Sequence, residues 1–181
     1  MTIGIKKAAL GLILTFIGLV FVLPAVFWLV SVQADAAFHV GPILPIPVSL
    51  ILAATFILIG IFWITWAYSY LVFVGKGLPF EVFGRALQPT QVLVTTGPYA
   101  YTRNPMVLGA MFVLLGVAFL ARSPSGLILV PVASLIAYIY LVTFEEKALL
   151  ERFGSDYEEY RRNVPALIPR LSPYIHEPAG A

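Results

Sequence analysis

The segment Gly97–Pro105 carries the residues best suited to bind a charged ligand. Asn is a favoured helix N-cap and Pro is favoured at the first helical position, so Asn104 and Pro105 predict that a helix begins here. The first turn of a helix offers free amide donors and the positive end of the helix dipole, which attract an anion. Arg103 adds a positive charge and a planar set of donors beside that turn.

The residues just before this helix start add a turn and two aromatic faces. Gly97 and Pro98 predict a tight turn, and Tyr99 and Tyr101 supply flat, half-polar rings. Together with Arg103, these residues suit a ligand that has a carboxylate at one end and an aromatic base at the other. The alternative is a capped helix whose arginine and tyrosines anchor the protein at a membrane interface.

An acidic pair, Glu145–Glu146, follows the last long apolar run. We expect the pair to end a helix, where carboxylates oppose the helix dipole. That cost favours a functional role over the alternative, a solvated helix end. Because adjacent helical residues diverge by about 100°, one of the two side chains is expected to face a ligand. We predict that this pair and the Arg103 segment converge on one ligand at the membrane surface.

The composition is that of a membrane protein. Of the 181 residues, 60% are hydrophobic and 11% are charged, whereas a soluble domain has about 25% charged residues. The chain has no cysteine and its two histidines show no ligand spacing, so no metal site is predicted. The net charge of +2 is too small to indicate nucleic-acid binding.

Four apolar runs predict transmembrane helices, because a bilayer core requires about 20 apolar residues and the backbone must be hydrogen-bonded within each segment. The runs are Ala8–Val32, Ile46–Val74, Met106–Ala121 and Leu127–Phe144. The predicted fold is all-α, a multi-pass transmembrane bundle in a single integral membrane domain, 1–181. Its predicted parts are two N-terminal spans (1–74), a loop (75–104) and a catalytic hairpin with a C-terminal cap (105–170).

The basic residues predict the orientation. Ten of the eleven Lys and Arg residues lie on one side of the predicted membrane, and Arg122 lies on the other. The positive-inside rule therefore places both termini and the 75–104 loop in the cytoplasm.

Small residues on one face of the first run predict close helix packing. They recur at alternating spacings of four and three, at Gly4, Ala8, Gly11, Thr15 and Gly18. Such a face lets helix backbones approach closely, either within the chain or in a homodimer.

The region after the last run predicts an amphipathic helical segment at the membrane surface. Apolar residues recur there at helical spacing, at Leu149, Phe153, Tyr157, Tyr160 and Val164. We expect this segment to cover a pocket, with Tyr157 and Tyr160 contacting the substrate. The alternative is a surface helix that touches no ligand.

Taken together, these motifs resemble the isoprenylcysteine carboxyl methyltransferase and phospholipid methyltransferase family. The resemblance covers about residues 75–170 and rests on Gly97–Met106, Gly109, Glu145–Glu146 with Leu149–Leu150, Phe153–Gly154 with Tyr157 and Tyr160, Pro165, and Ile168–Pro169. The carboxyl methyltransferases typically have His at the position of Asn104, where Asn is closer to the phospholipid methyltransferases.

The resemblance implies a multi-pass helical enzyme that uses S-adenosylmethionine at the cytosolic face and takes its acceptor from the lipid. It implies cofactor contacts from Gly97, Pro98, Tyr99, Tyr101, Arg103, Asn104, Pro105, Glu145 and Glu146. The acidic pair would hold the ribose or the amino group of the cofactor. Arg103 and Glu146 would be the catalytic residues, with Arg103 near the reacting centre.

Two other classes of function stay open at this point. Membrane sterol reductases share a similar C-terminal pattern and bind NADPH, but that pattern usually has Asn-Tyr after the proline, where this chain has Met106–Val107. A non-enzymatic membrane scaffold would retain the fold, with the small-residue face of the first helix as its main working surface.

Overall fold

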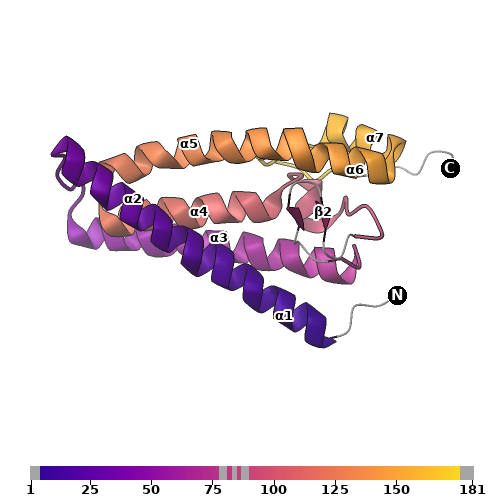
Figure 1. The fold of residues 1–181 in the computed structure, drawn as a ribbon, viewed down its shortest axis with the longest axis horizontal. Coiled ribbons are helices and arrows are strands. Elements are labelled where there is room, and N and C mark those ends of the chain that lie inside the picture. Colours follow the sequence, from indigo (N-terminus) through magenta and orange to yellow (C-terminus); the bar gives the residue numbers. More distant parts are fainter. Residues whose placement is uncertain (1–4, 78–80, 83–84, 87–89, 176–181) are drawn as a thin grey trace. The chain divides into compact units, whose positions relative to one another are not determined.

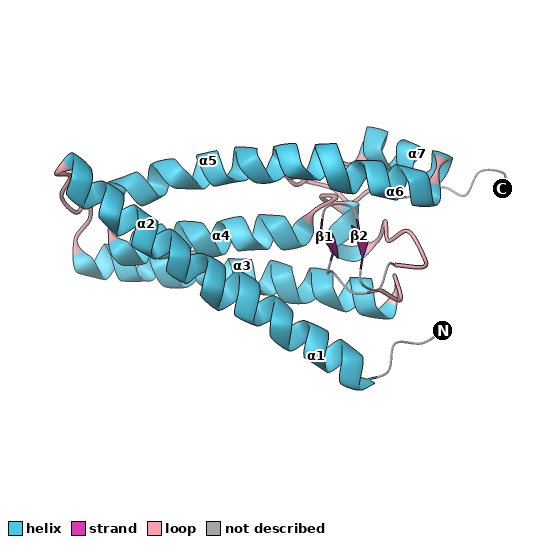
Figure 2. Ribbon diagram, viewed as in Figure 1, coloured by secondary structure: helices cyan, strands magenta, loops and turns pink. Residues whose placement is uncertain are grey.

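The computed structural model describes residues 5–77, 81–82, 85–86 and 90–175, which are mostly helical (Figures 1 and 2). Gly4 lies outside the described residues. The elements in chain order are α1 (Ile5–Phe16), the π-helix η1 (Ile17–Val22), α2 (Leu23–Phe38), α3 (Ile46–Phe73), β1 (Glu81–Val82), β2 (Arg85–Ala86), the 3-10 helix η2 (Gly97–Ala100), α4 (Pro105–Ala121), α5 (Pro124–Tyr140), the π-helix η3 (Leu141–Glu145), α6 (Glu146–Phe153) and α7 (Ser155–Asn163).

Three helical segments among the described residues are long and apolar enough to cross a membrane. They are Ala9–Phe38, Ile46–Phe73 and Pro124–Phe153, with 30, 28 and 30 residues. The apolar helix α4 is shorter, at 17 residues. These helices give an all-α, multi-pass membrane fold, so the predicted fold class is confirmed.

The first and last helical segments extend beyond the predicted apolar runs. α1, η1 and α2 follow one another to Phe38, and α5 continues through η3 and α6 to Phe153. A helix satisfies its own backbone hydrogen bonds, so it continues from the apolar core into polar sequence without loss. The pair Glu145–Glu146 lies inside the last segment. The prediction that this pair ends a helix is therefore wrong, and so is the dipole cost expected at a helix end.

Many large apolar side chains on these helices are exposed. Phe21, Leu29, Ile51, Phe62 and Ile136 are between 59% and 66% exposed. Large apolar side chains exposed to this extent are unfavourable in water, whereas in a bilayer the lipid chains cover them.

The chain divides into two compact units. Unit 1 comprises Met1–Gly11, Thr65–Met106 and Tyr138–Ala181, and unit 2 comprises Leu12–Ile64 and Val107–Ala137. Because α1, α3, α4 and α5 each pass from one unit to the other, this division does not decide the domain organisation. The single domain stays a prediction.

In unit 2, α3 and α4 pack backbone to backbone through glycines. A Cβ added to Gly60 would lie 2.5 Å from the carbonyl oxygen of Gly109, and one added to Gly109 would lie 2.7 Å from that of Gly60. Only small residues allow helices to approach so closely. On the α2 side, Phe27 packs with Leu114 and Val117 of α4.

The described residues of unit 1 include two apolar clusters. In the first, Ala67 of α3 packs with Val94 and Tyr99. The second unites the five residues of the predicted C-terminal stripe, which are Leu149, Phe153, Tyr157, Tyr160 and Val164. The stripe is therefore confirmed as one apolar face, and it packs inside unit 1 although the helix breaks at Gly154, where φ is 56°.

The small-residue face of the first helix is partly used inside the chain. Gly11 and Thr15 are buried, whereas a Cβ added to Gly18 would meet nothing within 4 Å. A homodimer through this face stays a prediction.

Candidate functional site

The turn before α4 is shaped by its glycine. Gly97, the first residue of η2, has a φ of 61°, which glycine adopts without strain. Its backbone lies against the ring of Tyr70, so that a Cβ at this position would collide with the ring. α4 then begins at Pro105, as the Asn-Pro sequence predicts. Arg103 therefore lies two residues before the first residue of α4.

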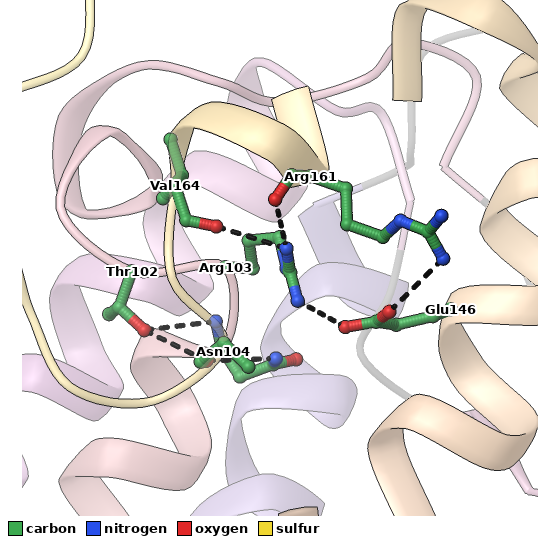
Figure 3. A network of polar contacts seen from close by, with 7 residues as sticks. Thr102, Arg103, Asn104, Glu146, Arg161 and Val164 are labelled. Carbon is green, nitrogen blue, oxygen red and sulfur yellow. Dashed lines mark hydrogen bonds and ion pairs between the residues drawn. The ribbon is translucent and has the colours of Figure 1, made fainter. Parts of the chain in front are cut away.

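Arg103 and Glu146 join the start of α4 to the acidic pair. Arg103 Nη2 donates a hydrogen bond to Glu146 Oε1, and the two side chains are only 10% and 8% exposed. Arg161 Nη1 lies 3.7 Å from Glu146 Oε2, so the carboxylate faces two guanidinium groups (Figure 3). The two sequence motifs therefore meet in a buried ion pair. Their predicted convergence on one ligand stays a prediction.

The acidic pair lies at a change of helix type. The π-helix η3 ends at Glu145, and Glu146 is the first residue of α6. Short π-helical turns inside α-helices are frequent at functional sites. Glu146 is buried and faces Arg103, whereas Glu145 is partly exposed. The pKa of Tyr99 is raised mainly by burial, with contributions from Tyr160 and from the charge of Glu145.

Four backbone carbonyls, those of Arg161, Val164, Pro165 and Ala166, form what we call the carbonyl clamp. Arg103 Nη1 donates to Arg161 O at 2.6 Å and to Val164 O at 3.0 Å, and the Arg103 backbone N–H donates to Pro165 O at 2.9 Å. The last carbonyls of a helix lack intrahelical partners and lie at the negative end of its dipole. The guanidinium of Arg103 therefore caps the C-terminal end of α7.

The residues on either side of Arg103 bind the fourth carbonyl of the clamp. Thr102 Oγ1 donates to Ala166 O at 2.9 Å, and Asn104 Nδ2 donates to the same oxygen at 3.0 Å. Pro105 is buried at the helix start. The amide of Asn104 is thus engaged by the protein itself, and its predicted contact with a cofactor stays a prediction.

Three further bonds hold the turn to the C-terminal region. Tyr160 Oη donates to Tyr99 O at 2.7 Å, and backbone N–H groups of Arg170 and Tyr174 donate to Tyr101 O and Ala100 O, each at 2.9 Å. The turn also contacts α3, because the rings of Tyr101 and Trp66 lie 6.1 Å apart. Pro98 and Tyr99 are buried.

Tyr157 and Tyr160, the predicted substrate-binding residues, lie in the core of unit 1. They are 1% and 3% exposed. Burial raises the pKa of both hydroxyls above the ordinary value of 10.0, and the charge of Glu146 adds to the shift at Tyr157. The Tyr160 hydroxyl supports the turn, and contact of either residue with a substrate stays a prediction.

Arg103 retains one unsatisfied donor. Its Nε–H is buried and has no hydrogen-bond partner among the described residues. An unpaired buried donor costs about 1–3 kcal/mol, so an acceptor at this nitrogen would stabilise the site.

The sequence did not predict the carbonyl clamp or a role for Thr102 or Tyr174. Backbone carbonyls carry no residue signature, and Thr102 and Tyr174 are brought to the site by contacts far along the chain. The one local signal was Pro165, which requires the chain to leave the helical path and so leaves the carbonyls before it without helical donors.

The fold and this site define a multi-pass membrane protein with a buried arginine–carboxylate pair between distant helical segments. A sequence model of the phospholipid methyltransferase family matches residues 48–156, and the chain belongs to this family.

Relatives with described activities are mostly methyltransferases. The chain is 30% identical over 131 residues to methanethiol S-methyltransferase 2 of Bradyrhizobium diazoefficiens, covering 65% of this chain and 48% of the relative. It is 36% identical over 80 residues to protein-S-isoprenylcysteine O-methyltransferase of Schizosaccharomyces pombe, covering 44% of this chain and 34% of the relative. It is also 30% identical over 121 residues to the cobalt-zinc-cadmium resistance protein CzcN of Cupriavidus metallidurans, covering 62% and 56%. The chain thus spans about half the length of these relatives or less.

Proposed function

We propose that the protein is an S-adenosylmethionine-dependent methyltransferase that acts on a lipophilic or membrane-embedded acceptor. The observation that carries the proposal is the buried Arg103–Glu146 pair, in a chain that belongs to a methyltransferase family. The named relatives differ in their acceptors. The acceptor class is therefore an isoprenylcysteine-like carboxylate, a phospholipid amine or a small thiol.

The donor set fits such a cofactor, which carries a cationic sulfonium, an amino group and a carboxylate. Glu145 and Glu146 would supply negative charge to the cationic groups, Glu146 from within its ion pairs with Arg103 and Arg161. Arg103 supplies a buried Nε–H that has no acceptor of its own among the described residues. Tyr99 and Tyr101 bring aromatic rings to the same turn, and aromatic faces attract cations.

When bound, the cofactor would supply an electrophilic sulfonium methyl group for transfer to a nucleophilic acceptor, with the thioether as the leaving group. Such a transfer needs little acid–base help from the protein when the acceptor is already nucleophilic. The contribution of Arg103 and Glu146 is then orientation, and well-oriented reactants can lower a barrier by roughly 7–11 kcal/mol. Their rigid network of ion pairs and carbonyl contacts suits this role.

We further propose that both termini and the site face the cytoplasm, where the cofactor is available. The asymmetry of Lys and Arg supports this orientation. Because the chain has no cysteine, single cysteines at the exposed positions Gly41 and Asp156 test it with a membrane-impermeant maleimide on intact host cells. Labelling is expected at position 41 only. The reverse pattern would show the opposite orientation.

The cofactor assignment is tested by calorimetric titration of the purified protein in lipid nanodiscs with S-adenosylhomocysteine, and with NADPH as the competing class. We expect S-adenosylhomocysteine alone to bind, and Glu146→Ala to weaken binding at least about tenfold, or 1.4 kcal/mol. Binding of NADPH alone, or of neither ligand, would refute the proposal. Glu145→Gln tests the other carboxylate in case Glu146→Ala does not fold.

Transfer of tritiated methyl groups then identifies the acceptor. The probes are phosphatidylethanolamine in the nanodisc, a farnesylcysteine analogue and a small alkyl thiol. We expect one class to be labelled and labelling to fall in Glu146→Ala. Labelling of none of the three would contradict the proposed acceptor classes.

A further inference from the structure

Thr102 is a fully buried residue beside the proposed centre to which neither the family resemblance nor the proposed chemistry gives a role. It is 0% exposed. Its hydroxyl donates to Ala166 O at 2.9 Å and accepts a longer bond, of 3.4 Å, from the backbone N–H of Asn104. Both functions of the hydroxyl are thus used at the point where α4 begins.

Three consecutive residues are tied to two consecutive carbonyls of the clamp. Thr102 and Asn104 both donate side-chain hydrogen bonds to Ala166 O, and Arg103 donates its backbone N–H to Pro165 O. With the backbone held on both sides, the Arg103 side chain reaches the other two clamp carbonyls and Glu146 (Figure 3). The position of the guanidinium therefore depends on how the backbone around it is held.

Within this arrangement Thr102 is the more constraining of the two flanking residues. It is fully buried, whereas Asn104 is partly exposed. Its β-branched side chain has few rotamers, so its hydroxyl binds Ala166 O from a nearly fixed position. The Asn104 side chain has more freedom and shares the same acceptor.

We propose that Thr102 is a positioning residue: its hydroxyl, by tying the start of α4 to Ala166 O, fixes the Arg103 guanidinium against Glu146. The effect on catalysis rests on the proposed function. The effect on Arg103 itself is a property of the ligand-free protein and is measured separately.

The test compares Thr102→Val, which keeps the shape and removes the hydroxyl, with Thr102→Ser, which restores it. Ser31→Ala is the matched control, because Ser31 is also 0% exposed and donates to a backbone carbonyl, Phe27 O, at 2.7 Å. Nitrogen-15 NMR of the ligand-free protein observes the Arg103 Nε–H, a buried group without a hydrogen-bond partner among the described residues. Its signal is assigned by its loss in Arg103→Lys.

We expect Thr102→Val to shift the Arg103 Nε–H signal and speed its exchange with water, and both other variants to leave it unchanged. S-adenosylhomocysteine binding is expected to weaken about fivefold in Thr102→Val, the equivalent of one buried hydrogen bond, and to recover in Thr102→Ser. In an Arg103→Lys background, Thr102→Val should weaken binding no further, because Thr102 acts through Arg103.

An unchanged Arg103 signal in Thr102→Val would overturn the inference, as would equal changes in Ser31→Ala. A further weakening of binding in the Arg103→Lys background on adding Thr102→Val would also contradict it. If the wild-type protein binds no S-adenosylhomocysteine while the Arg103 signal still responds to Thr102→Val, the cofactor assignment fails and the positioning role stands.

Discussion

Replacing Glu146 by Gln should destabilise the protein far more than the same change at Glu158. Each glutamate pairs with an arginine, Glu146 with Arg103 and Glu158 with Arg162. The first pair is buried, with side chains 8% and 10% exposed. The second is on the surface, with side chains 45% and 73% exposed. The chemical change is identical, and the two sites differ in burial and in the second guanidinium, that of Arg161, which faces Glu146.

The expected magnitudes follow from what each change leaves behind. Glu146→Gln leaves the Arg103 guanidinium buried without a counter-charge at its Nη2, and breaking a buried pair in this way costs about 3–5 kcal/mol. Arg161 is 41% exposed and turns to water when its partner is lost. Glu158→Gln removes an exposed i,i+4 pair, which is worth about 0.3–0.5 kcal/mol.

The assay is reversible unfolding in mixed detergent micelles, followed by tryptophan fluorescence. Trp66 lies 6.1 Å from Tyr101 and therefore reports on the turn that carries Arg103. The free energy of unfolding should fall by about 3–5 kcal/mol in Glu146→Gln and by less than about 1 kcal/mol in Glu158→Gln. Equal losses in the two variants would show that the Arg103–Glu146 pair is not buried as described.

Three other predictions concern the support of the site and the helix crossing. Gly97→Ala should lower the melting temperature for two reasons. A φ of 61° costs a residue with a Cβ about 1–2 kcal/mol, and the added methyl group collides with the Tyr70 ring. An unchanged melting temperature would contradict this prediction. Tyr160→Phe should cost about 1 kcal/mol, and it should also flatten the alkaline loss of stability measured by pH titration. The raised pKa of Tyr160 keeps its hydroxyl neutral in the folded protein. Ionisation of this hydroxyl in the unfolded chain above pH 10.0 therefore favours unfolding. A pH profile of stability identical to that of the wild type would count against this prediction. Gly60→Ala should lower the free energy of unfolding by about 1–3 kcal/mol, because the new Cβ would lie 2.5 Å from Gly109 O. An unchanged free energy of unfolding would show that α3 and α4 separate freely.

Much of the fold follows from local sequence. Apolar runs predicted the membrane helices, and Asn104–Pro105 predicted the start of α4 at Pro105. The helical spacing after the last run predicted the stripe that packs in unit 1. The helix ends were less accurate, because charged residues such as Glu146 continue a helix once its backbone bonds are formed. Sequence spacing could not predict η3 either, since a π-turn has no residue signature of its own.

The candidate site likewise has features that the sequence predicted and features that it did not. The sequence by itself supplied the chemistry: an arginine at a helix start, two carboxylates after an apolar run, and aromatic residues at a turn. Only the tertiary structure decided that Glu146 pairs with Arg103, and that Thr102 and Asn104 share the carbonyl of Ala166. The physical reason is that these contacts join residues 43 to 64 positions apart, and most of their acceptors are backbone carbonyls, which every residue carries alike.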